Sequence, residues 1–480
     1  MRVIAASLSD SLLSQSLETT PACTAVSFEL RQSPVKSAGS SRRAVSWLLL
    51  AGILIRLAVL IAAEPDNPDS HAAVIEYIAD HRSLPVSNLL TQSYQPPLYY
   101  VLMAPLWAVW HSKAPIHFVS FVLSCANLLM IRRLLFRREV TTDSTARVAA
   151  FALACFMPEF VMFSGFISND ALTLPLGTLL FLCTLNYIHT PSMKWLAALA
   201  SLMGLCLLTK GTFLATGLAL AGLVGIIESR SGLRMTAMRV AIFCTIWSVL
   251  GCYKYVDNAV RLGHPFVHNL DAMPREDRGK FIAYKGLQTL YDINIVKLIR
   301  SPIAHPGHIF SYPLLMYGTF WYPHVPESSF RGNVFGYDWI GSITYAVAVV
   351  PTLVFLIGVA RGAMLSMGVL RVPRAQWHMQ VRGLVAMAAM LMLFSNLAVV
   401  VAAGIRYDNW WCFQSRLCFQ SMMPILCLFG LGMEAIPKAP RLRTIIAGFC
   451  FATAACGVLY FVVEVALVYS LLPPGQEMLP

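Results

Sequence analysis

The chain has 480 residues, of which 57% are hydrophobic and 12% are charged, and its mean hydropathy is +0.64. Soluble domains carry about 25% charged residues, so this composition excludes a string of water-soluble domains and indicates a polytopic membrane protein. The net charge of +12 does not predict a nucleic-acid partner here, because Lys and Arg in a membrane protein first mark the loops that stay in the cytoplasm.

The sequence contains about eleven apolar runs that approach the roughly 20 residues needed to span a membrane. They are residues 44–63, 115–131, 147–165, 171–188, 195–209, 211–227, 238–255, 340–360, 383–404, 417–435 and 443–470. A further apolar stretch, 95–111, contains Pro96, Pro97 and Pro105, which suit a segment at the membrane surface better than a regular span. We therefore predict an all-α polytopic membrane protein with about eleven transmembrane helices.

The basic residues predict the orientation of these helices. If 95–111 does not span, more than half of the 36 Lys and Arg residues fall in the N-terminal tail and in short loops on its side of the membrane. If 95–111 spans, the basic cluster at 132–138 and the later basic loops move to the other side, against the positive-inside rule. We predict a cytoplasmic N-terminus and an external C-terminus.

This orientation divides the chain into four parts. Residues 1–43 form a polar cytoplasmic tail, which we expect to be flexible, and 44–255 form a core module whose first external loop is 64–114. Residues 256–339 form a large external loop, and 340–480 contain the C-terminal spans. Long structured loops on one face are typical of membrane enzymes, whereas a carrier more often has polar groups at mid-membrane.

The first external loop begins with acidic residues directly after the first span. Asp66 and Asp69 lie in the sequence EPDNPDS, and Asp69 or Ser70 is suited to cap an amphipathic surface helix that starts near His71. A carboxylate at this place is suited to take a proton from an incoming hydroxyl. The alternative is that these acids are only solvated and capping groups.

Further polar residues stand at the ends of predicted spans. Asn169 and Asp170 precede an apolar run, either as turn and cap or as site residues. Lys210 is a lone ammonium between two apolar runs, suited either to snorkelling or to binding a phosphate. Arg416 opens a span on the external side, against the charge rule, and Arg56, midway along the first span, must face protein or a cavity.

Taken in chain order, these polar segments resemble those of the GT-C glycosyltransferases, in particular the bacterial branch related to protein O-mannosyltransferases and to the aminoarabinose transferase of lipid A. The resemblance covers roughly residues 44 to 435 and implies a GT-C fold with amphipathic surface helices in the first external loop. It rests on the acidic first loop with Asp66 and Asp69-Ser70-His71, on Gln95-Pro96-Pro97-Leu98-Tyr99-Tyr100, on Ser168-Asn169-Asp170, on Leu208-Thr209-Lys210-Gly211 and on Gln414-Ser415-Arg416.

The family transfers a sugar from a polyprenyl-phosphate carrier to an acceptor outside the cytoplasm. The resemblance implies that Asp69, or alternatively Asp66, is the catalytic base and that Asp170 orients the sugar or the acceptor. Lys210 and Arg416 would hold the carrier phosphate. The other implied substrate-binding residues are His71, Gln95, Tyr99 and Asn169. No cofactor is predicted, although related oligosaccharyltransferases use a divalent metal held by acids.

The sequence therefore predicts a glycosyltransferase of a bacterial inner membrane with a periplasmic active site. Its partners would be a polyprenyl-phosphate-linked sugar, a glycan, lipid or protein acceptor of the cell envelope, and membrane lipids, with no nucleic acid. One alternative is a transporter or flippase of a lipid-linked substrate, for which Arg56 is the main sequence feature. A second alternative is a glycan polymerase or ligase that uses a diphosphate carrier.

Overall fold

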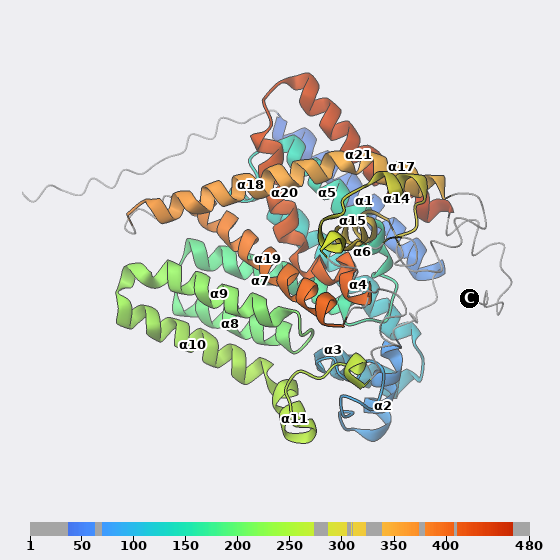
Figure 1. Ribbon diagram of the computed structural model, residues 1–480, viewed down its shortest axis with the longest axis vertical. Coiled ribbons are helices and arrows are strands. Elements are labelled where there is room, and N and C mark those ends of the chain that lie inside the picture. Colours follow the sequence, from blue (N-terminus) through green and yellow to red (C-terminus); the bar gives the residue numbers. More distant parts are fainter. Residues whose placement is uncertain are drawn as a thin grey trace, which may run out of the picture. The chain divides into compact units, whose positions relative to one another are not determined.

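The structure, a computed structural model, describes residues 37–62, 70–272, 287–304, 309, 311–322, 338–373, 380–407 and 410–463. These residues form helices and connecting loops, with no β-strand among them (Figure 1). The predicted all-α class is confirmed.

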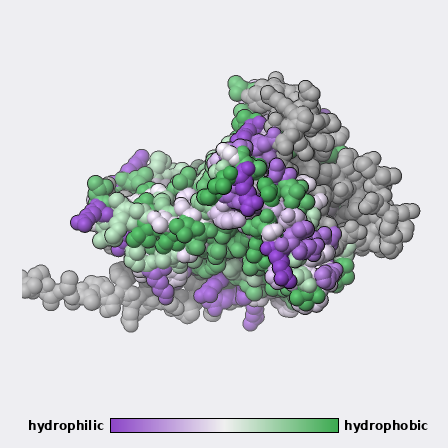
Figure 2. All heavy atoms as spheres, turned by 90° about the horizontal axis from the view of Figure 1, so that it is seen from below, coloured by the Kyte–Doolittle hydropathy of each residue, from purple (hydrophilic) through white to green (hydrophobic). Residues whose placement is uncertain are grey.

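Nine segments of the described chain are helical, long and apolar enough to cross a membrane. They are α1 (Ser37–Ala62), α4 (Ala114–Leu135), α7 (Asp170–His189), α9 with η1 (Phe213–Glu228 and Ser229–Ser231), α10 (Leu233–Gly251), α17 with α18 (Trp339–Val347 and Val349–Arg371), α19 (Val381–Tyr407), η5 with α20 (Ser415–Ser421 and Met422–Ala435) and α21 (Pro440–Val463). Each coincides with a predicted span, and the chain is a multi-pass membrane protein. Figure 2 shows broad hydrophobic areas on the viewed face, with hydrophilic side chains gathered in patches.

Two predicted spans, 147–165 and 195–209, are helices shorter than a regular crossing. The first is divided into α5 (Ser144–Phe156) and α6 (Pro158–Met162), because Pro158 has no amide hydrogen and favours the extended conformation found at Met157. The second is α8 (Met193–Leu207), which ends just before the turn that contains Lys210. The run 195–209 has only 15 residues, as α8 does, whereas the length of 147–165 gave no sign of the division at Pro158.

The stretch predicted as the first external loop forms two packed helices. These are α2 (His71–His81) and α3 (Leu98–Trp110), which share an apolar core that includes Ile75 and Tyr99. The 13 residues of α3 extend over about 20 Å, less than the roughly 30 Å of a bilayer core. This agrees with the prediction that 95–111 does not span.

The stretch predicted as the large external loop, 256–339, contains short helices in its described parts. They are most of α11 (Tyr253–Leu262), followed by η2 (Asn269–Ala272), α13 (Gln288–Tyr291), α14 (Val296–Arg300) and α15 (Tyr312–Trp321). The helix α15 packs on the segment before α20, where the rings of Tyr312 and Phe413 stack with centroids 3.5 Å apart.

Glycine allows α18 and α20 to pack with their backbones in direct contact. A Cβ atom on Gly358 would overlap the carbonyl oxygen of Leu428, and one on Gly432 would overlap that of Val354. Small residues at such contacts are typical of helix pairs in membranes, where close van der Waals packing drives association. This packing holds the helix that follows η5 in place.

Arg56 is fully buried and binds the end of a neighbouring helix. Its guanidinium donates to the carbonyl of Cys155 at 2.8 Å and to the hydroxyl of Ser124 at 2.9 Å, and it lies over the ring of Phe160. The carbonyl of Cys155 lacks a helical partner because α5 ends before Pro158. Arg56 therefore has a structural role, and the main sequence feature in favour of a flippase is accounted for without a transport pathway.

Candidate functional site

The candidate site lies where α2, α3 and α7 meet the turn between α8 and α9. The backbone amide of Leu98, the first residue of α3, donates to the carbonyl of Leu208 at 2.9 Å. This bond joins the start of α3 to the turn that contains Lys210. Three of the five sequence motifs thus meet. They are the motif that begins at Gln95, the motif that contains Lys210, and Ser168-Asn169-Asp170 at the start of α7.

Asp170 and Lys210 form a buried ion pair at the centre of this site. The carboxylate lies in the first turn of α7 and accepts from the Lys210 ammonium, and the two residues are only 6% and 5% exposed. An acidic residue in the first turn is also favoured by the helix dipole. Asp170 does not cap α7 with its side chain, so the simple capping role considered from sequence is wrong.

His71 begins α2, as predicted, and its buried ring connects α3 to α7. Its Nδ1 lies 2.8 Å from the hydroxyl of Tyr100, and its Nε2 lies 3.4 Å from the hydroxyl of Ser168. That hydroxyl in turn lies 3.5 Å from the carboxylate of Asp170. Ser70 has a left-handed backbone conformation, and its side chain does not cap α2, which corrects one of the two capping predictions.

Asn169 joins the two sides of the site through its side-chain amide. The amide donates to the carbonyl of Thr209 at 3.1 Å and lies 3.4 Å from the side-chain oxygen of Gln95. Gln95 in turn donates to the hydroxyl of Tyr94 at 2.9 Å. Asn169 and Gln95, both predicted as site residues, therefore lie together beside Lys210.

Tyr99 and Tyr100 are buried in the apolar core between α2 and α3. Burial raises the pKa of the Tyr99 phenol. Both rings are fully buried, so neither tyrosine is an exposed anchor at a membrane interface.

Arg416 lies on η5, with its guanidinium 5.4 Å from the centre of the Phe163 ring. η5 packs on α7 and reaches the Lys210 turn, where the hydroxyl of Thr212 donates to the side chain of Gln420 at 2.7 Å. The structure thus places Arg416 on an element that contacts the site.

The predicted bases Asp66 and Asp69 lie outside the described residues. Asp69 directly precedes Ser70 in the sequence, and His71 follows. Within the described chain, no three His, Cys, Asp or Glu side chains lie together in a way that could hold a metal ion. Metal binding by the first-loop acids is therefore untested.

A cluster of rings and charges next to Gln95 was missed in the sequence. The His268 ring lies between those of Tyr94 and Tyr407, with centroids 4.2 and 4.8 Å away. Asp271 accepts from Tyr407 at 3.3 Å and from Arg406 at 3.2 Å. These residues come from three distant segments, and no local motif could have predicted that they meet.

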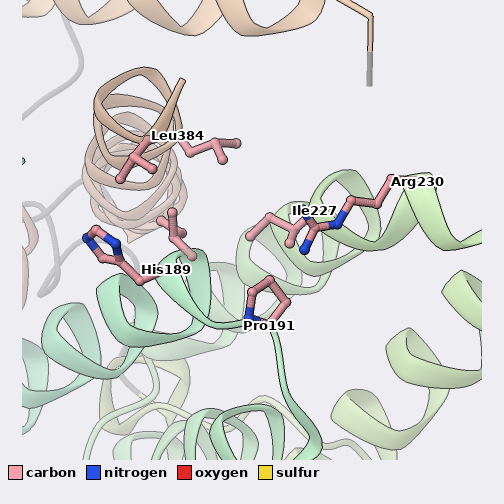
Figure 3. Close-up of a pocket in the computed structure, with 7 residues that line it drawn as sticks. His189, Pro191, Ile227, Arg230 and Leu384 are labelled. Carbon is pink, nitrogen blue, oxygen red and sulfur yellow. The ribbon is translucent and has the colours of Figure 1, made fainter. Parts of the chain in front are cut away.

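A small cavity of about 70 Å³ lies at the other end of α7. Figure 3 shows His189, Pro191, Ile227, Arg230 and Leu384 around it. His189 and Asp170 end and begin the same helix of 20 residues, so they are about 28 Å apart along its axis. This cavity is thus remote from the Asp170–Lys210 pair and lies at the predicted cytoplasmic end.

The fold and the site define a multi-pass helical membrane protein in which acids, amides and cations gather at one end of the helices. No family model matches the sequence, and no curated protein matches it.

Among solved structures, the archaeal oligosaccharyltransferase AglB from Archaeoglobus fulgidus, in complex with an inhibitory peptide and a dolichol-phosphate, aligns with a TM-score of 0.46 and 12% identity over 88% of this chain. The alignment covers 56% of AglB, so this chain spans little more than half of its length. ArnT from Cupriavidus metallidurans, bound to undecaprenyl phosphate, aligns with a TM-score of 0.37 and 14% identity over 81% of this chain and 77% of ArnT. Both are GT-C glycosyltransferases, the class that the sequence resembles.

Proposed function

We propose that this chain is a membrane glycosyltransferase that moves a sugar from a polyprenyl-phosphate carrier to a cell-envelope acceptor at the external face of the membrane. The observation that supports this proposal is the convergence of motifs far apart in sequence. His71, Gln95, Asn169, Asp170 and Lys210 come from four segments and lie in one bonded cluster.

The buried ion pair gives the cluster a cation for a phosphate. Burying a Lys–Asp pair often contributes little to stability compared with apolar residues of similar volume, so stability alone is a weak reason for its presence. In the proposal, the donor phosphate binds the Lys210 ammonium beside or in place of the Asp170 carboxylate. Arg416 supplies a second cation from η5.

The proposed reaction is a substitution at the anomeric carbon. The acceptor hydroxyl oxygen forms a bond to this carbon while the bond from the carbon to the phosphate oxygen breaks. The electron pair of the broken bond leaves with polyprenyl phosphate, whose negative charge is stabilised by Lys210 and Arg416. The hydroxyl proton passes to Asp69 or Asp66 as general base.

The test is transfer of labelled sugar by the purified protein in lipid nanodiscs, with a monophosphate or a diphosphate carrier as donor. We expect transfer from the monophosphate carrier. Transfer from the diphosphate carrier alone would favour the polymerase or ligase, and movement of intact carrier across vesicles without transfer would favour the flippase.

The same assay tests the base. Asp69→Asn or Asp66→Asn should lower the transfer rate about 100-fold or more, the lower end of general-base effects. Asp80→Asn is the matched control, because Asp80 is an exposed acid on α2 that has no proposed role. Full activity in both first-loop variants would exclude these two acids as the base.

A further inference from the structure

The helix α11 has apolar residues on its outward side and polar residues on its inward side, the reverse of a surface helix exposed to water. Its outward residues are apolar, with Tyr253, Val256 and Val260 exposed by 48%, 59% and 79%. Spacings of three and four place these residues on one face. The inward residues Lys254 and Asn258 are polar and buried.

The buried polar side of α11 binds the linker between α2 and α3. The ammonium of Lys254 donates to the carbonyl of Pro85 at 3.3 Å, and the Ser87 hydroxyl donates to the side-chain oxygen of Asn258 at 2.6 Å. The Asn258 amide also donates to the carbonyl of Pro265 at 3.1 Å. The inward polar groups thus have hydrogen-bond partners in the protein. These bonds hold α11 with its polar side inward and its apolar side outward.

The helix that precedes α11 in the chain also exposes apolar residues. In an apolar stretch of 18 residues within α10, 11% of the residues are buried inside the protein. The corresponding value for the segment formed by η5 and α20 is 89%. α10 therefore has few fully buried residues, and its exposed apolar side chains, such as Met238 and Val249, would face lipid if it spans the membrane. It ends at Gly251, and α11 begins two residues later (Figure 1), so the exposed Val249 of α10 and the exposed Tyr253 of α11 are only four residues apart in the chain.

Charged residues stand at one flank of α11. Asp257 and Arg261 form an ion pair of 2.7 Å at a spacing of four. At 100° per residue, they fall between the exposed apolar face and the buried polar side. A helix with an apolar face and one charged flank is suited to lie in a membrane–water interface.

We infer that α11 lies in the bilayer interface, with Tyr253, Val256 and Val260 in contact with lipid, and that it thereby fixes the α2–α3 linker at the membrane surface. The same helix reaches the candidate site, since a Cβ on Gly211, next to Lys210, would lie 3.1 Å from the hydroxyl of Tyr255. This inference is independent of the proposed chemistry and requires only that α10 spans the membrane.

The test places the unmodified chain in vesicles of phosphatidylethanolamine and phosphatidylglycerol that contain a phospholipid with a photoactivatable acyl chain. After illumination, mass spectrometry locates lipid adducts. Val249 on α10 is the internal positive control. We expect adducts at Tyr253, Val256 and Val260, at yields several-fold above those at Asp257 and Arg261.

Adducts on α10 without adducts on the α11 face would overturn the inference, as would equal yields around α11. A second measurement uses a benzophenone amino acid at Val256 or Val260 in the same vesicles. Cross-links to lipid are expected there; cross-links mainly to a second copy of the chain or to another protein would show that a protein covers this face.

Discussion

The carboxylate of Asp170 binds the ammonium of Lys210 across 40 residues of sequence, with both groups almost fully buried. Removing one partner leaves an uncompensated buried charge, which typically destabilises a protein by about 3–5 kcal/mol. We therefore expect Lys210→Met to lower the thermal denaturation temperature in detergent markedly. The double variant Asp170→Asn/Lys210→Met should recover part of this loss, because it leaves no buried charge. Additive losses would show that the two groups do not interact.

Arg56 should not tolerate replacement by lysine. A lysine keeps the charge, but it lacks the planar fork that reaches Ser124 and Cys155 together. We expect Arg56→Lys to reduce the amount of folded protein and its denaturation temperature, measured by size-exclusion chromatography during heating. Arg43→Lys, at an exposed position on the same helix, is the control and should resemble the parent. Equal behaviour of the two variants would contradict the structural role of Arg56.

The His268 cluster should weaken in acid. Burial lowers the pKa of His268 to about 4, from an ordinary value of 6.5, and Arg406 adds to this shift while Asp271 opposes it. The unfolded chain therefore takes up the proton first as the pH falls. The stabilisation from the neutral ring is complete above about pH 6.5 and is lost as the pH falls toward 4.

This pH dependence can be followed by thermal denaturation between pH 7 and 5. The parent chain should lose stability over that range, and His268→Gln should lose less. Asp271 and Arg406, which face the ring, remain in both proteins. A His268→Gln variant with the same pH profile as the parent would assign the acid sensitivity to other groups.

Gly358 should be far less tolerant of a side chain than Gly368 on the same helix. A Cβ at Gly358 meets the backbone of α20, whereas a Cβ at Gly368 has no neighbour within 4 Å. Overpacking typically destabilises by about 1–3 kcal/mol, and backbone contact leaves little room to relax. Gly358→Leu should therefore separate α18 from α20 and lower the denaturation temperature, while Gly368→Leu should change it little.

The helices were largely predictable because twenty apolar residues in a row have few alternatives to a membrane span. The exceptions have local causes. Pro158 divides one predicted span, and the turn around Lys210 ends α8 two residues before the predicted boundary at 209. The prediction that 95–111 does not span rested on its prolines and on the distribution of charge, and the 13 residues of α3 agree with it.

Sequence reasoning proposed individual residues for the site but not their partners. His71, Gln95, Asn169, Asp170 and Lys210 were identified separately, and the pairing of Lys210 with Asp170 appears only in three dimensions. His268 was missed because its partners Tyr94 and Tyr407 come from distant segments. The apolar outward face of α11 was missed because its short, mixed sequence resembles a water-exposed helix until its buried side is known.

The position of Arg56 has a consequence for how the chain is inserted during synthesis. Its partner Ser124 follows 68 residues later in the chain, and Cys155 follows 99 residues later. Until those residues emerge from the ribosome, an arginine in the second half of α1 faces lipid or the translocation channel. The free-energy cost on insertion scales is about 2.5–3.5 kcal/mol at the centre of a helix, which sets the upper limit here. We expect α1 to remain beside the insertion machinery, or to bind an insertion chaperone, until α4 and α5 have been made.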